Sequence, residues 1–450
     1  MVTDPELIKT IMVKDFDTFS EHRPLLPPDV DPIWSNNLLA MGGGQKWQDL
    51  RATLSPSFTS SKMKAMFSLM KECSSQFVLY FQSQSDEIVE VELKDSFARL
   101  ANDVIATTAF GVNCDSLSNP NNEFYKSARA LSNVTGIRGL LLLLNAFLPT
   151  LAKITRIPII PKKVNHFFTS IVKDAIKLRE EQKIKRPDML NLLIESRKAR
   201  PTNDRPATVP EAGFSAVDES DYGKGRQKIF ATDEIITSQV LIFFFAGFDS
   251  VSTMMSYTIY ELALNPDIQE KLRKEVDDTL EAANGEFTYD NLMGMKYLDM
   301  VVSESLRKWP PFTDNDRRSV KPYVIKAQRP EEADLYLEKG SILLFPVYPI
   351  HRDPKYYPNP EQFDPERFNE ENREKINRCA YMPFGSGPRN CIASRFALME
   401  GKLVVAEIIR HFEIVVIRKT QIPIVLSKTN FNPLPDEGIW VGFKRRNLSV

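Results

Sequence analysis

The sequence has 450 residues, 42% of them hydrophobic, so the chain can bury a large core, and its length allows about three domains. Basic and acidic residues nearly cancel (58 against 59), which argues against nucleic acid as the main partner, because nucleic-acid-binding proteins carry a basic excess. The four cysteines are too few for a disulfide framework and fit a reducing compartment, and no two have the CxxC spacing of a structural zinc site.

The apolar residues give mixed membrane signals. No stretch reaches the roughly 18 consecutive apolar residues of a membrane-spanning helix, and we find no signal peptide at Met1. Short apolar runs within 140–161, interrupted by prolines, are equally typical of contact with a bilayer surface and of a buried helix end. Both interpretations stay open.

The first two-thirds of the chain show apolar residues at helical spacing. Residues 199–228 interrupt this pattern with proline, glycine and polar residues, which predicts a mobile surface loop. A domain linker is the alternative, but the helical pattern resumes unchanged afterwards, which favours a loop. The predicted helices cover 56–83, 95–110, 122–145, 162–198 and 232–264.

The last of these helices, from about Asp233 to Leu264, is unusually long for a globular protein. Its middle holds Gly247, Asp249 and Ser250 among apolar residues. A glycine inside a helix costs on the order of 1 kcal/mol relative to alanine, and a buried carboxylate needs a partner or water. This pattern indicates that the polar residues serve a function.

The composition and periodicity of the sequence change after Pro310. Residues 321–327 and 340–346 have the composition of short strands, and proline-rich irregular chain follows over 349–365. The chain therefore reads as α+β, mostly helical, and wrapped around one site.

A lone cysteine, Cys391, ends the loop that begins at Phe384, and the run 392–404 reads as a helix. Loop amides and a helix N-terminus both favour a thiolate over a thiol. Such a thiolate is either a nucleophile or a soft metal ligand.

Four motifs occur in order: Ala246–Ser250, Glu304–Arg307 with ExxR spacing, Pro365–Phe368 and Phe384–Cys391. Together they resemble the cytochrome P450 family of haem-thiolate monooxygenases, from about Asp4 onward. The resemblance implies one catalytic domain over 1–450, with a long central helix over the haem and a small β-rich part.

Insect microsomal members of the detoxification type are the most similar, on the run Leu241–Asp249 and the long loop before it. Such proteins usually carry an N-terminal membrane helix and early strands, which this sequence lacks. We therefore expect an N-terminally short domain and an unpaired strand edge along 340–346.

The resemblance implies that Cys391 is the proximal thiolate ligand of haem b, with Phe384 shielding it and Ala246 near the cofactor. A buried inert cysteine is the alternative. The propionate partners would be Trp47 and Arg51, four residues apart, together with Arg317 and Arg389. A surface arginine is the alternative for each of them.

Glu304, Arg307 and Arg367 match the buried charge triad of the family, which has a structural role. An exposed helix ion pair is the alternative.

Asp249 and Ser250 match the acid–alcohol pair that delivers protons to dioxygen. The family usually has threonine at position 250, so the hydroxyl is kept but the stiffening β-branch is lost. A serine bonded to a backbone carbonyl is the alternative. Ala393 stands where the family prefers glycine, which predicts strain and weaker haem binding if the position is crowded against the porphyrin or needs a positive φ. A tolerated methyl group at the start of a helix is the alternative.

The implied activity is insertion of one atom of O2 into an apolar small molecule, a xenobiotic or an endogenous lipid-like compound. Electrons would come from NADPH through cytochrome P450 reductase, because the chain shows no dinucleotide fingerprint of its own, and cytochrome b5 is a second candidate partner. A catalytically impaired haem- or ligand-binding protein is the alternative. The resemblance places the protein on the cytosolic side of the endoplasmic reticulum membrane, in contact with it through 140–161.

We also predict residues for a substrate pocket and for a surface on which the reductase docks. The substrate pocket would include Phe248, Phe312 and Thr313, although aromatic residues at helical spacing are more often core. A basic docking face for the reductase, or an ordinary solvated surface, would comprise Arg378, Arg389, Arg395 and Lys402.

Overall fold

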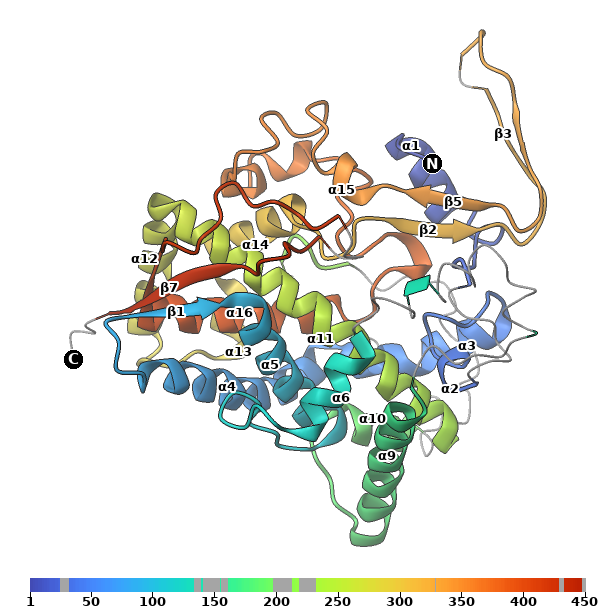
Figure 1. Ribbon diagram of the computed structural model, residues 1–450. Helices are drawn as coiled ribbons and strands as arrows, with labels where there is room; N and C mark the ends of the chain where they lie inside the picture. The colour runs from blue at the N-terminus through green and yellow to red at the C-terminus, as the bar shows by residue number, and fades with distance from the viewer. Residues whose placement is uncertain are drawn as a thin grey trace.

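The computed structural model describes residues 1–24, 32–132, 139–140, 154, 161–196, 213–217, 232–327, 329–428 and 433–446. It is mostly helical with small sheets at the periphery, which confirms the predicted α+β class (Figure 1). Most of the predicted loop 199–228 and of the predicted membrane contact 140–161 lies outside the described residues.

The helical elements, in chain order, are α1 (Pro5–Lys9), η1 (Thr10–Lys14), α2 (Pro32–Ser35), α3 (Gln45–Leu54), η2 (Ser55–Phe58), α4 (Ser60–Gln82), α5 (Leu93–Ile105), η3 (Ala106–Phe110), α6 (Glu123–Ser132), α9 (Lys162–Gln182), α10 (Met189–Ser196), α11 (Asp233–Leu264), α12 (Pro266–Ala282), α13 (Tyr289–Gly294), α14 (Lys296–Lys308), α15 (Val347–Ile350), η4 (Pro365–Phe368), η5 (Arg373–Lys375), η6 (Gly387–Arg389) and α16 (Ser394–His411).

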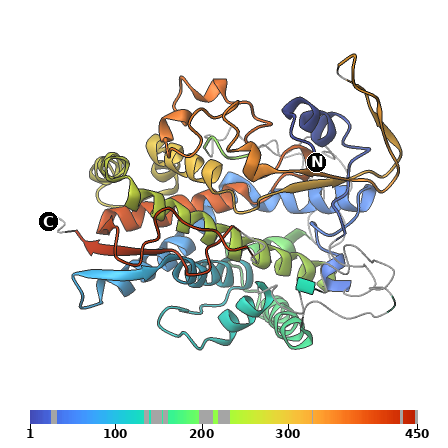
Figure 2. The ribbon, with the colours of Figure 1, turned by 45° about the horizontal axis from the view of Figure 1, so that its top comes forward.

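The long helix α11 runs through the centre of the molecule and packs against α5, α14 and α16 (Figure 2). The Thr232 side chain caps its N-terminus by accepting a hydrogen bond from the Ile235 N–H, and Asn265 ends it before Pro266. By length and composition α11 could cross a membrane, but most of its residues are buried inside the protein. Its bounds agree with the predicted 232–264.

The predicted helix 162–198 is wrong as a single element, because the chain breaks it into α9 and α10. Lys183 takes a left-handed conformation with φ 53° at the end of α9, and Pro187 precedes α10. The break is fixed by a buried bidentate ion pair, in which Arg179 donates to both carboxylate oxygens of Asp188 at 2.6 and 2.7 Å. Pro187 is a local signal of this break that the prediction of one continuous helix overlooked.

Three small antiparallel sheets lie outside the helical core, in the orders β1-β7-β6, β2-β5 and β3-β4. The β3–β4 hairpin projects from the body of the molecule (Figure 1). On the far edge of β5, the Val2 N–H donates to the Leu344 carbonyl at 2.8 Å, so the edge predicted to be unpaired is partly covered. The strands are β1 (Ile88–Glu92), β2 (Asn315–Arg318), β3 (Tyr323–Ile325), β4 (Leu335–Leu337), β5 (Ile342–Phe345), β6 (Phe412–Val415) and β7 (Trp440–Arg445).

Candidate active site

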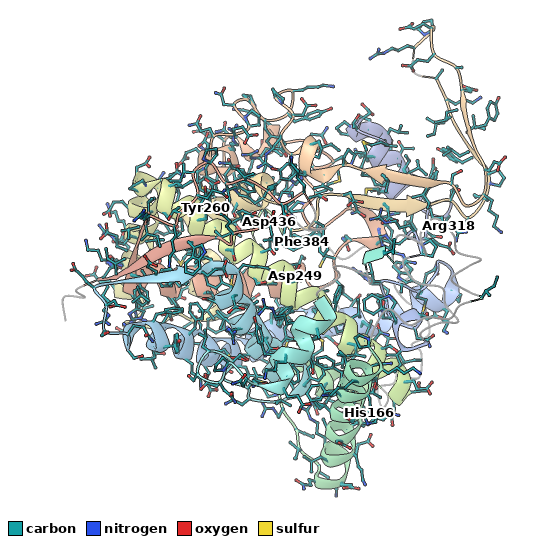
Figure 3. The ribbon with its side chains drawn as sticks, viewed as in Figure 1. His166, Asp249, Tyr260, Arg318, Phe384 and Asp436 are labelled. Carbon is teal, nitrogen blue, oxygen red and sulfur yellow. The ribbon has the colours of Figure 1, made fainter. Side chains whose placement is uncertain are left out.

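The loop before Cys391 is a compact turn fixed by glycines. Gly385 and Gly387 have φ 73° and 72°, and a side chain on Gly387 would lie 1.9 Å from the Met12 carbonyl oxygen. The Cys391 N–H donates to the Phe384 carbonyl at 2.9 Å and closes the loop. Figure 3 labels Phe384, where the loop begins.

The sulfur of Cys391 therefore lies just before α16, whose N-cap is Ala393. A helix N-terminus favours negative charge, which suits a thiolate at this place. Ala393 has φ −101°, an ordinary backbone conformation for alanine. The turn needs no positive φ there, so this source of strain at Ala393 is absent, and the effect of crowding against the porphyrin stays a prediction.

The three predicted propionate arginines all contact this loop. Arg51 of α3 donates to the carbonyl and side-chain oxygens of Asn390, both at 2.8 Å. Arg317 of β2 donates to the Ser386 carbonyl at 3.0 Å. Arg389 belongs to the loop itself, and its guanidinium lies 4.0 Å from the centre of the Trp47 ring.

These guanidinium groups are buried and close enough to repel one another. Burial lowers the pKa of Arg317 to about 10. Burial, together with Arg317 and Arg51, holds the pKa of Arg389 well below its ordinary value. His22 lies in the same cluster, and burial lowers its pKa to about 4 despite its bond to Asp316.

This cluster fits the propionates of haem. Buried cations need anionic partners, and the Nε of Arg317 has no hydrogen-bond partner among the described residues. Two carboxylates placed here would offset two of the three positive charges and accept a hydrogen bond from that donor, and the Cys391 thiolate would be the ligand of iron. The residues present therefore fit haem b, held by Cys391, Arg51, Arg317 and Arg389.

The middle of α11 presents a small-residue face. Ala246 is exposed although its neighbours in the helix are half-buried or buried, and Ser250 lies one turn further on the same face. The Ser250 hydroxyl donates to the Ala246 carbonyl at 2.6 Å, as the structural alternative predicted. Its oxygen keeps acceptor capacity for a second partner. A side chain on Gly247 would meet Ile105 at 2.5 Å, so glycine here allows α5 to pack closely.

Asp249 points toward α5 and forms an ion pair with Lys94 at 2.8 Å (Figure 3 labels Asp249). The side chains of Asp249 and Lys94 are 24% and 18% exposed, so water reaches the pair. Nothing in the sequence around Lys94 marked this residue, because its partner lies 155 positions away.

Glu304, Arg307 and Arg367 meet in the structure. Arg307 donates to both carboxylate oxygens of Glu304 at 2.7 and 2.9 Å, and both side chains are fully buried. The Arg367 Nε lies 3.4 Å from Glu304. Arg307 also donates to the His351 carbonyl at 2.9 Å, which ties α14 to the segment after β5.

Phe248 lies away from this site. It is 3% exposed and packs against Phe244 and Tyr125 in the aromatic core, on the side of α11 opposite to Ala246. Core packing accounts for Phe248 and argues against its predicted place in the substrate pocket. Phe312 is 49% exposed and Thr313 is half-buried, so both can contact a ligand.

The predicted docking face is wrong for two of its four cations. Lys402 is fully buried and forms an ion pair with Asp299 at 2.7 Å, and Arg389 is buried with Arg51 and Arg317 against the cysteine loop. Helical position alone did not reveal that this side of α16 faces the core. Arg378 and Arg395 keep exposed surface.

Sequence reasoning also missed the segment 213–217, which packs on α14 and on the chain before the cysteine loop. The Phe214 N–H donates to Asp299 at 2.8 Å, and Arg378 stacks on the Phe214 ring at 3.8 Å. Ser215 exchanges a hydrogen bond with Ser303 at 2.8 Å. The single signal was an aromatic residue within a polar stretch.

Comparison with known proteins agrees with this geometry. The family model for cytochrome P450 matches residues 1–440. The chain is 42% identical to cytochrome P450 9e2 of Blattella germanica over 461 residues, covering 99% of this chain and 83% of that protein. It is 38% identical to probable cytochrome P450 9f2 of Drosophila melanogaster, covering 99% and 84%. With cytochrome P450 6k1 of Blattella germanica it shares 36% identity, covering 100% and 83%. These relatives confirm the predicted resemblance to insect members, and the chain belongs to the cytochrome P450 family of haem-thiolate monooxygenases.

Proposed function

We propose that this protein inserts one atom of O2 into a C–H bond of an apolar small molecule, a xenobiotic or an endogenous lipid-like compound. The second oxygen atom leaves as water, which takes two electrons and two protons. The observation that carries this proposal is the cluster of Arg51, Arg317 and Arg389 against the loop that ends in Cys391. Thiolate-bound haem iron would supply activation of dioxygen.

The residues of the chain divide the remaining work. The three arginines would bind the propionates, and the cysteine loop would hold the sulfur near the helix N-terminus. Trp47 would support Arg389 by stacking, because its indole N–H already donates to the Leu38 carbonyl at 3.2 Å. Ser250 offers a hydroxyl on the exposed face of α11, and Asp249 next to it is a carboxylate in contact with water. We infer that this pair moves protons from solvent to the face of α11 that carries Ala246.

The electrons would come from NADPH through a reductase that docks beside the cysteine loop. The cations there include exposed Arg378 and half-buried Arg395, with exposed Lys9 and Lys14 on the neighbouring α1 and η1. η1 touches the loop at Gly387, so these lysines belong to the same side of the molecule. An acidic flavoprotein surface would complement them. We place the protein at the cytosolic face of the endoplasmic reticulum membrane.

The test is turnover by the haem-loaded protein with NADPH, cytochrome P450 reductase and a panel of apolar substrates under 18O2. We expect product that carries one 18O atom and that depends on the reductase. A protein that binds haem and shifts its spectrum with ligands, yet gives no 18O product with any substrate, would instead be a binding protein.

A further inference from the structure

The ammonium group of Lys94, the second residue of α5, lies within hydrogen-bond distance of four oxygen atoms of α11. Its ammonium donates to the Asp249 carboxylate at 2.8 Å and to the Asp249 main-chain carbonyl at 2.9 Å. It also lies 2.6 Å from the Ser252 hydroxyl and 2.9 Å from that of Thr253. An ammonium has three protons, so these four oxygens share its donors.

Helix α5 begins just before Lys94 and packs against α11 along its length. At the start of α5, Glu92 caps the helix by accepting hydrogen bonds from the Lys94 and Asp95 N–H groups. At its far end, Ile105 packs against Gly247, where an added methyl group would lie 2.5 Å from the end of the Ile105 side chain. Helix α5 thus packs along α11, and this packing brings the Lys94 ammonium to Asp249.

Lys94 contacts the polar groups of α11 that face α5 but does not contact Ser250. The Asp249 carboxylate is turned to the α5 side by the ammonium, whereas the Ser250 hydroxyl is bonded to the Ala246 carbonyl on the other face. Lys94 also holds the Asp249 carbonyl, which accepts hydrogen bonds from the Ser252 and Thr253 hydroxyls. One side chain thus sets both the carboxylate and the local backbone next to Ser250.

We propose that Lys94 is a positioning residue for proton delivery: it anchors the Asp249 carboxylate at the water-exposed edge of α11 and sets how efficiently protons reach Ser250. This inference rests on the proposed function of Asp249 and Ser250. Without the ammonium, the carboxylate would adopt many orientations, and proton transfer to Ser250 would be less efficient. Reducing equivalents would then leave as hydrogen peroxide, formed from O2 by two electrons and two protons, instead of as product.

The experiment compares Lys94→Met with the unchanged protein, after haem content and the carbon monoxide spectrum have been matched. We expect the ratio of product to peroxide to fall at least fivefold, with Lys94→Arg restoring a large part of it. In the Asp249→Asn background, Lys94→Met should have no further effect on the ratio, because the two residues act as one unit. Additive effects of the two substitutions would overturn the proposal.

Arg99→Met is the matched control, because Arg99 lies on α5 and pairs with Asp95 at 2.7 Å rather than with α11. Arg99→Met removes an ion pair within α5 and should leave the product-to-peroxide ratio unchanged. If the ratio falls as much in Arg99→Met as in Lys94→Met, Lys94 acts only through the stability of the protein. Urea unfolding of the haem-free variants is the second readout, where Lys94→Met and Asp249→Asn should be non-additive. If the unchanged protein forms no product, the proposed function fails; if it turns over and Lys94→Met keeps its ratio, the Lys94 inference alone fails.

Discussion

Replacement of Arg307 by methionine is expected to lower the free energy of unfolding by about 3–5 kcal/mol, because it leaves the Glu304 carboxylate buried without its bidentate partner. Burial alone would lower the pKa of Arg307, but its hydrogen bonds to Glu304 outweigh this effect and raise that pKa. A domain is typically stable by about 5–15 kcal/mol, so the loss is large. Equilibrium urea unfolding measures it as a shift in midpoint at constant slope.

Two further variants make this result interpretable. Lys296→Met removes an ion pair with Glu370 from the same helix, but both partners are largely exposed, so the midpoint should barely move. The double variant Arg307→Met with Glu304→Gln removes the uncompensated carboxylate and should regain part of the loss. Equal midpoints for Arg307→Met and Lys296→Met would contradict a buried charge triad that holds α14 in place.

Replacement of Arg317 by methionine is expected to weaken haem binding by about 10- to 150-fold. The reason is the loss of a charged hydrogen bond to a propionate, worth about 1.5–3 kcal/mol. In the haem-free protein the same variant should be as stable as the unchanged chain or more stable. The reason is that burial and the positive charge of Arg389 both disfavour a charged guanidinium at position 317. The rate of haem transfer to an excess of an acceptor protein measures the first effect, and urea unfolding measures the second.

Arg318 provides the control for this prediction because it follows Arg317 on β2 and so points to the other face of the strand. It pairs with Glu21 at 3.2 Å and is partly exposed (Figure 3). Arg318→Met should leave haem transfer unchanged. If Arg317→Met retains haem as well as Arg318→Met does, the cation cluster is not the propionate site.

Much of the fold could be predicted because its strongest signals are local. The apolar periodicity of α11, its acidic first turn and the Asn265–Pro266 stop lie within one stretch of sequence, and the predicted bounds agree with the structure. The strands β1 and β7 were missed because each is short and gains its stability from a partner far along the chain. The break between α9 and α10 is held by the Arg179–Asp188 pair, although Pro187 marks it locally and the prediction of one helix overlooked that signal.

The candidate site divides in the same way. Residues inside short motifs, such as Glu304, Arg307 and Cys391, could be named from the sequence. Contacts made by tertiary packing could not: Lys94 reaches Asp249 from another helix, and Lys402 is buried although its type and spacing fit a docking surface. Phe248 shows the opposite error, since its motif position favoured the pocket while its ring belongs to the core.

The most direct test of thiolate ligation is the absorbance difference spectrum of the haem-loaded, dithionite-reduced protein with and without carbon monoxide. We predict a strongly red-shifted Soret band that is lost in Cys391→Ser, while Cys379→Ser, a buried cysteine before the loop, keeps it. A red-shifted band that survives in Cys391→Ser, or a band at the shorter wavelength typical of histidine or neutral thiol ligation in the unchanged protein, would contradict this account.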